Sequence, residues 1–222
     1  AELTATLDSG HVVLIANKSF DLVDATLRLN HINAGSITQN EMLGHLTLES
    51  AISGVITDQF TVKYLETTTT IGLVELNGRG FSQIPISVDM DGDMYTYSIE
   101  IADSALHAST QGKIQVANTS FHFVSKIQID HAGIRDMGIL DTDYRISSSI
   151  YVEFQEDEDK NRRGQLVISD ADLYKSGARY HIDKLDLIAS ATDEFVGLEL
   201  NSDVAHARFT GNTRLTELKD AF

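Results

Sequence analysis

Residues 144–154, YRISSSIYVEF, alternate apolar and polar side chains with a period of two. Ile150 and Phe154 would share one face of an extended strand, and Arg145 and Glu153 the opposite face. Such a strand buries one face and exposes the other to water. The pattern recurs along most of the chain, and no catalytic signature interrupts it. The sequence therefore predicts a protein whose function rests on a long apolar sheet face.

The alternating segments number about thirteen and are separated by turn residues, which predicts an antiparallel meander. Residues 84–90 and 95–101 form the clearest pair, because Asp91-Gly92 between them suits a hairpin with a primed turn. Another strand is expected over 60–64. The meander is therefore built largely from neighbouring hairpins.

Breaks in this pattern are few. Pro85 is the single proline; it lacks an N–H donor, so its strand is expected at an edge, near a bulge or at its start. Helical signal is weak: residues 129–140 are expected to form one or two turns with Asp130 as N-cap, and the segment from Arg214 is the other candidate. Neither is long enough to be stable without packing on the sheet.

Only one face of most predicted strands is apolar, so the sheet must cover that face with a second sheet, with itself or with a ligand. A sandwich or closed barrel is one solution, and a sheet curled into an open trough is another. Alternation by itself favours a packed core. With 222 residues and 42% hydrophobic content, the chain is long enough for one elongated all-β unit, 1–222, with a possible subdivision near 80 and 130–140.

Composition excludes several function classes. The net charge of −16 argues against a nucleic-acid surface and against docking on anionic lipid head groups, because both need clustered Lys and Arg. The absence of cysteine excludes disulfides and thiolate-bound metal and leaves the compartment open. No apolar run of about 18 residues reads as a membrane-spanning helix. Because the sequence begins and ends within a strand-rich pattern, we expect an internal piece of a longer protein.

Two acidic segments are candidate cation sites. Asp89, Asp91 and Asp93 surround Gly92 at a spacing close to that of a calcium loop. However, the glycine comes one residue too early for an EF-hand, no helices flank the run, and no Glu occupies the twelfth position. We interpret it as a solvated hairpin turn. The stretch 155–163 is likewise interpreted as a long solvated loop in which opposite charges balance.

No pattern of catalytic or metal-binding residues stands out. The histidines lack His-x-x-x-His spacing, and three or four would have to converge across the sheet to bind zinc. No G-x-S-x-G elbow, P-loop or G-x-G-x-x-G motif is present, and the chain has no tryptophan to stack sugars. We predict no enzymatic activity, no cofactor and no metal. The histidines are His11, His31, His45, His107, His122, His131, His181 and His206.

The order of segments in the C-terminal part is similar to that of a known family. Residues 124–140 read as a strand feeding a short turn, followed by the strand 144–154, a polar loop and the strands within 164–190. The segment 198–218 then repeats a strand, a Ser-Asp step, a strand and a glycine. This succession resembles the TamB/AsmA-like family of the Gram-negative envelope (translocation and assembly module, repeating β-groove).

The resemblance extends over residues 80–222. In the first 80 residues only the general character of the sequence is similar, and no specific motif matches. It implies an all-β fold, a long antiparallel meander curled into an open β-taco with an apolar interior. It also implies a periplasmic location within an inner-membrane-anchored protein, where the groove serves phospholipid transport between the membranes or outer-membrane protein assembly. The implied partners are phospholipid acyl chains and outer-membrane assembly proteins, with membrane contact through other segments of the parent chain. The residues expected to face lipid are Tyr95, Tyr97, Ile99, Ile101, Phe121, Phe123, Ile127, Ile146, Ile150, Val152, Phe154, Leu166, Ile168, Leu185, Leu187, Leu198 and Leu200.

Two other function classes stay open. A surface adhesin or fimbrial-type β-sandwich would have two packed sheets with loops clustered at one end. A carbohydrate-active or metal-dependent β enzyme would need at least three convergent His, Asp or Glu side chains in a concave site. A continuous apolar trough would instead favour lipid transport.

Overall fold

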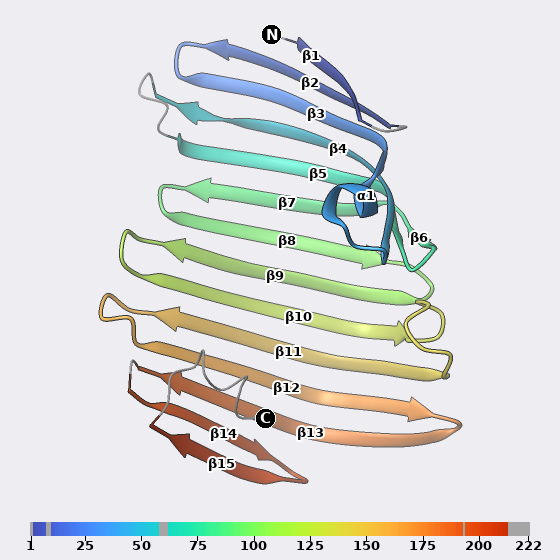
Figure 1. Cartoon of the computed structure of the whole chain (residues 1–222), viewed down its shortest axis with the longest axis vertical. Helices are drawn as coiled ribbons and strands as arrows, with labels where there is room; N and C mark the ends of the chain where they lie inside the picture. Colours follow the sequence, from blue (N-terminus) through green and yellow to red (C-terminus); the bar gives the residue numbers. More distant parts are fainter. Residues whose placement is uncertain (1, 8–9, 58–61, 193, 213–222) are drawn as a thin grey trace.

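The computed structural model describes residues 2–7, 10–57, 62–192 and 194–212. Within them the chain forms one antiparallel sheet of fifteen strands and one short helix, and strands adjacent in the sheet follow one another in the sequence (Figure 1). Only β6 lies off this path, paired with β5. The elements are β1 (Glu2–Leu7), β2 (Gly10–Ser19), β3 (Leu22–Asn33), α1 (Ala34–Thr38), β4 (Leu43–Ile56), β5 (Val62–Leu76), β6 (Arg79–Phe81), β7 (Ile84–Asp91), β8 (Met94–Ala102), β9 (Leu106–Val116), β10 (Phe121–Gly133), β11 (Tyr144–Glu156), β12 (Arg162–Lys175), β13 (Ala178–Ala191), β14 (Val196–Ser202) and β15 (His206–Gly211).

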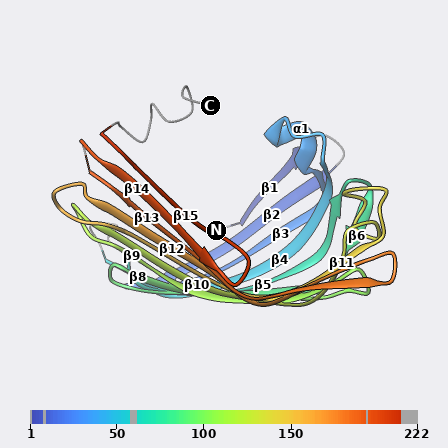
Figure 2. The ribbon, with the colours of Figure 1, turned by 90° about the horizontal axis from the view of Figure 1, so that it is seen from below.

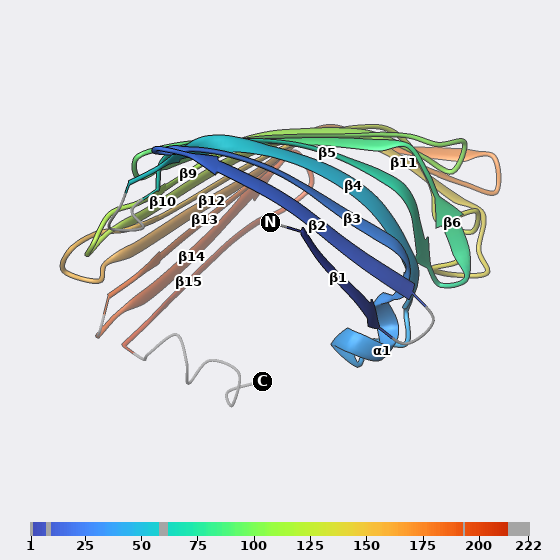
Figure 3. The same cartoon turned by 90° about the horizontal axis from the view of Figure 1, so that it is seen from above.

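The sheet curls along its strands into an open trough. Figures 2 and 3 show the strands bending toward one side, where α1 also lies. The trough runs across the strands from β1 to β15, and strand ends and turns form its two long margins. The predicted all-β meander is therefore confirmed, and the sheet is open rather than closed into a barrel.

The antiparallel register sorts the side chains of this sheet into two faces. Ile86, Ile99, Thr110, Ile127, Ile150 and Ile168 stand opposite one another across β7 to β12 and form one row of the apolar face. On this face Ser50, Ser125 and Ser148 are only 5%, 3% and 5% exposed, because neighbouring side chains converge on the concave side of a curled sheet. The apolar face is thus the inner face of the trough, and the polar face is the outer one.

The fully buried apolar side chains lie at strand ends rather than along the middle of the inner face. At one margin the short β5–β6 hairpin meets the turns that follow β8 and β10. Arg79 joins them, because its Nη2 donates to Asp103 Oδ1 at 2.7 Å and its Nη1 to the carbonyl oxygen of Asp136 at 2.6 Å. We call this region the clasp. Its buried apolar members are Phe81, Ile84, Ala105 and Ala132.

The hairpin predicted between 84–90 and 95–101 is present, with its turn shifted by one residue. Asp91 pairs with Met94, so the two-residue loop is Gly92-Asp93. Gly92 has a φ of 56°, which matches the first central position of a type II′ turn. Glycine reaches that conformation without steric cost.

The prediction of a helix over 129–140 is wrong in its first part. Strand β10 continues through a bulge to Gly133, and Asp130 lies within the strand instead of capping a helix. Pairing with β9 and β11 on both sides supplies backbone hydrogen bonds that a lone turn cannot match. The helix that the sequence analysis missed is α1, whose cap Asn33 accepts a hydrogen bond from Ser36 N–H at 2.9 Å.

The described residues form fifteen strands where about thirteen were expected. Strands β1, β2 and β6 were not recognised, and the segments at Tyr180 and Leu185, which were expected as two strands, form the single strand β13. Pro85 is the second residue of β7, ahead of the first pair that β7 makes with β8. It pairs with Thr70 of β5, and its position at the start of the strand is one of its expected places. Phe60 and the predicted helical segment from Arg214 lie outside the described residues.

Candidate functional site

The inner face of the trough carries every residue of the groove predicted from the sequence. The register places these residues in adjacent rows, from Tyr95 on β8 to Leu200 on β14. All of them are half-buried, since each touches its neighbours within the sheet and none is sealed from solvent. The structure thus brings the predicted residues together into one continuous surface.

Two rows of this surface cross the sheet without a charged side chain, and Lys18, Glu156 and Arg162 lie only toward one margin. Burying a charge without a partner is costly, so an uncharged strip is what an apolar occupant requires. The first row is Leu14, Leu27, Ser50, Thr69, Ile86, Ile99, Thr110, Ile127, Ile150, Ile168 and Leu185. The second row is Ala16, Ala25, Ile52, Thr67, Val88, Tyr97, Gly112, Ser125, Val152, Leu166, Leu187 and Leu200.

Tyr97 lies flat across the middle of the second row. A Cβ atom on Gly112 would come within 2.6 Å of the Tyr97 ring, so the ring occupies the space that a side chain on β9 would fill. The Tyr97 hydroxyl donates to Ser125 Oγ at 2.8 Å, and Thr110 Oγ1 lies 3.1 Å from the same oxygen. These three hydroxyl groups form hydrogen bonds with one another, so none of them is left on this part of the inner face without a partner.

Aromatic side chains gather toward the margin formed by the β9–β10 and β11–β12 connections. The rings of Phe121 and Phe154 are tilted by 53° with centroids 5.9 Å apart. Phe123 faces Phe154 across the strands, and Tyr95 follows two strands away in the same row. Such tilted pairs add to the stability that apolar burial provides.

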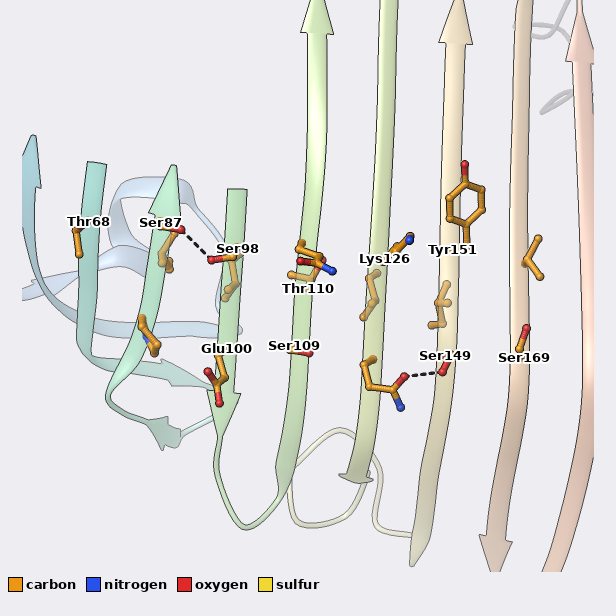
Figure 4. A pocket seen from close by; sticks show the side chains of 18 residues that line it. Thr68, Ser87, Ser98, Glu100, Ser109, Thr110, Lys126, Ser149, Tyr151 and Ser169 are labelled. Atoms are coloured by element: carbon orange, nitrogen blue, oxygen red, sulfur yellow. Dashed lines mark hydrogen bonds between the residues drawn. The ribbon is translucent and has the colours of Figure 1, made fainter. Parts of the chain in front are cut away.

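The outer face has a different character. A hollow of about 680 Å³ opens on it over β5 to β12, and Figure 4 shows it lined by hydroxyl and amide side chains. Several of these already bind one another: Ser87 Oγ lies 2.8 Å from Ser98 Oγ, and Ser149 Oγ donates to Gln128 Oε1 at 2.5 Å. Glu100, Lys126 and Val167 line it too, and most of its exposed surface is apolar. Its rows of polar side chains lie on the opposite side of the sheet from the predicted groove.

Hydrogen-bonded charged side chains also lie on the outer face. Tyr151 donates from its hydroxyl to Glu153 at 2.7 Å, and His122 Nε2 lies 2.9 Å from the other Glu153 oxygen. These hydrogen bonds, that of Tyr151 first, lower the pKa of Glu153. The same contact with Glu153 raises the pKa of the Tyr151 hydroxyl.

A second network joins the outer faces of β12 and β13. Arg179 binds Asp172 through two hydrogen bonds of 2.7 and 2.9 Å, and His181 Nδ1 lies 2.8 Å from Asp172 Oδ1. The other His181 nitrogen lies 2.9 Å from Asp183. Asp172 and then Asp183 raise the pKa of His181, whereas Arg179 and then His181 lower that of Asp172. No three His, Asp or Glu residues in the described chain are placed to hold a metal ion.

The two acidic segments behave as ordinary surface features among the described residues. Asp89 stands on the outer face of β7, and Asp93 lies in the turn. The loop predicted over 155–163 is shorter than expected, because both strands extend into it. Within it Glu156 binds Lys160 at 2.9 Å and Arg162 at 2.7 Å, so opposite charges do balance there.

The groove predicted from the sequence left out the N-terminal half of the inner face. Leu14, Leu27 and Ile52 continue the same rows, as do Ile86 and Val88. The signal for them was the same alternation of apolar and polar residues. The predicted groove began at β8 because the family resemblance covered mainly the C-terminal part of the chain.

Comparisons with known proteins give no assignment: no family model, no curated protein and no solved structure matches this chain. Within the described residues, no helix has the length and apolar character needed to cross a membrane.

Proposed function

We propose that the inner face of the trough carries the acyl chains of phospholipids. The observation that supports this most directly is the uncharged apolar strip that crosses the sheet and that no second layer covers within the described chain. Monomeric soluble proteins seldom leave such a large contiguous apolar surface without a binding role.

The free energy of the proposed binding comes from removing hydrocarbon from water. Each buried CH₂ group contributes about 0.8 kcal/mol. An acyl chain that moves along the trough would pass from strand to strand within these uncharged rows, so it would exchange one largely apolar surface for another with little change in free energy. Polar head groups would stay at the open side of the trough, in water.

We further propose that this trough is a segment of a TamB/AsmA-like envelope protein in the periplasm. The support is the motif order in residues 80–222 together with the open antiparallel meander. In that setting the trough would serve phospholipid transport between the two membranes, or the assembly of outer-membrane proteins. Phospholipid acyl chains and outer-membrane assembly proteins would be its partners.

A pair of tryptophan variants tests acyl-chain binding, because the chain has no tryptophan of its own. Ile150→Trp places the probe on the inner face, and Tyr151→Trp places it one residue further, on the outer face. With phospholipid brominated in its acyl chains, we expect strong quenching of the inner probe and little quenching of the outer one. Equal quenching, or none at either position, would contradict the proposal.

A second pair of variants tests whether the apolar strip is required. Ile127→Asp introduces a charge into the inner face, and Lys126→Asp places the same group on the outer face of the same strand. We expect at least a tenfold loss of transfer of a fluorescent phospholipid between vesicles for Ile127→Asp, with the β-sheet circular dichroism retained, and unchanged transfer for Lys126→Asp. Full transfer by a folded Ile127→Asp protein would count against the proposal.

The adhesin-type β-sandwich is the alternative function. That function would require two packed sheets with loops gathered at one end, whereas the described residues form one sheet. No observation on the outer face favours it specifically.

A further inference from the structure

The two uncharged rows of the inner face are not equally apolar along their length. Within the described residues, each row contains one run of four consecutive strands on which every side chain is valine, isoleucine or leucine, and each of these side chains is half-buried. We call the two runs together the aliphatic patch. The run in the first row is Ile127, Ile150, Ile168 and Leu185 on β10 to β13, and the run in the second row is Val152, Leu166, Leu187 and Leu200 on β11 to β14.

Smaller or hydroxyl-bearing side chains mark both ends of the aliphatic patch. In the first row they are Thr110 on β9 and Ser202 on β14. In the second row they are Ser125 on β10 and Ala207 on β15. The patch is therefore bounded on both sides by residues of the described sheet.

The same two rows are less apolar where they cross β4 and β5. They carry Ser50, Thr67 and Thr69 there, and the Thr69 hydroxyl donates to Ser50 Oγ at 2.8 Å. A hydrocarbon tail lying over these strands would contact less apolar surface than on the aliphatic patch and would cover hydroxyl groups, which are better left in water. The patch is thus the part of the two rows that best suits a hydrocarbon tail.

The dimensions of the aliphatic patch fit the tails of one lipid. Each run crosses four strands, and three strand spacings of about 4.8 Å make about 14 Å. The hydrocarbon core of a bilayer is about 30 Å thick and contains two layers of tails, so one tail extends over about 15 Å. The rows lie two residues apart along each strand, which is about 6.6 Å, so two tails can lie side by side with one on each row.

We infer that the aliphatic patch is the resting site of a two-tailed lipid, with one tail along each row. This inference rests on the proposed function and adds to it the class of lipid and the place where it is held. A diacyl phospholipid fills both rows, whereas a lipid with a single tail fills only one. The preference for the patch over the rest of the trough is moderate, because both rows stay uncharged on either side of it.

Two tryptophan variants in the second row test the place. Leu166→Trp puts the probe within the aliphatic patch, and Ile52→Trp puts it in the same row on β4. With phospholipid brominated in its acyl chains, we expect quenching to be at least threefold stronger at position 166. The first row offers a second pair for the same comparison, Ile168→Trp and Leu27→Trp, which replaces the first pair if one of its variants does not fold.

The outcomes of this comparison separate the inference from the proposed function. Equal quenching at the two positions, or stronger quenching at position 52, would overturn the inference and leave acyl-chain binding in place. Quenching at neither position would contradict the proposed function itself.

Native mass spectrometry of the unmodified protein tests the number of tails. We expect the tightest site to take one molecule of diacyl phosphatidylethanolamine per chain and two molecules of its single-tailed lyso form. The diacyl lipid should also displace the lyso form at a concentration at least tenfold lower than that of the lyso form. Equal stoichiometry for the two lipids would overturn the assignment of one tail to each row, and binding of neither lipid would contradict the proposed function.

Discussion

The clasp and the middle of the inner face are built from the same kinds of side chain, yet they serve different ends. Phe81 and Ile84 in the clasp are each 4% exposed, because turns fold over the strand ends there. Ile127 and Ile150 in the middle of the trough are half-buried and contact only their neighbours in the sheet. The difference indicates that this fold gains local stability where loops cover the sheet, and leaves apolar surface uncovered where they do not.

Phe81→Ala should have the largest effect on stability. Truncating a buried phenylalanine removes apolar contacts and leaves a cavity, so we expect the free energy of unfolding to fall by about 3–5 kcal/mol. Ile150→Ala should cost less than half as much, because that side chain is already partly in solvent. Urea denaturation followed by circular dichroism measures both, and equal losses would mean that the two regions contribute alike.

Glycine substitutions probe how tightly the middle of the inner face is built. In Gly112→Ala the new Cβ would meet the Val124 carbonyl oxygen at 2.5 Å and the Tyr97 ring at 2.6 Å, so we expect a loss of about 1–3 kcal/mol. Gly164→Ala is the matched control, because its Cβ would meet nothing closer than 3.7 Å. Thermal unfolding distinguishes them, and a tolerated Gly112→Ala would show that Tyr97 moves aside easily.

Arg79→Met tests whether the clasp depends on its hydrogen bonds. The variant loses the bonds to Asp103 and to the Asp136 carbonyl, and we expect a loss of about 1–2 kcal/mol. The lower end of that range is favoured because Arg79 Nε is buried without a partner among the described residues. Arg28→Met, which removes an exposed pair with Glu49, should cost about 0.5 kcal/mol or less. Equal values in urea denaturation would make the clasp an ordinary surface contact.

The smallest effect expected is a pH dependence at His181. Its pKa is raised from 6.5 by Asp172 and Asp183, so the protonated ring stabilises the folded state at low pH. That contribution is complete below the unfolded pKa and is lost as pH rises through the higher folded pKa. Between about pH 6 and about pH 8, His181→Gln should therefore show a smaller decrease in melting temperature than the unmodified protein.

The Asp172→Asn variant serves as a check on this prediction, because it removes the first cause of the shift. It should flatten the same pH profile, and an unchanged slope in both variants would exclude the network as its source. Asp172 itself has a lowered pKa, so its own contribution is present at neutral pH and is lost only as pH falls through that lowered value.

Much of the inner face could be predicted from the sequence because strand alternation is a local property. Once Ile150 and Phe154 are assigned to one face, every second residue of the strand follows, and the register of β10 to β12 only extends the pattern. The hairpin at Gly92 was predictable for a similar reason, since few residues other than glycine favour its conformation.

The parts that sequence could not supply depend on distant pairing. Bulges after Ile129 in β10 and after Ser169 in β12 shift the alternation by one position, and nothing in the local sequence marks them. The helical prediction at Asp130 failed because two neighbouring strands extend β10 beyond its apparent end. An open trough and a packed sandwich need the same one-sided strands, so the curl of the sheet could be chosen only with the structure in view.

Because each strand touches little besides the strands before and after it, the molecule is organised along a single dimension. We therefore expect the sheet to unfold from its two edges inward. Amide protons in β1 and β15 should exchange fastest and those in the central strands slowest. A substitution that destabilises one hairpin would lower the stability of the adjacent strands and have little effect on more distant ones. A chain built in this way tolerates lengthening or shortening by whole hairpins more readily than a globular core does.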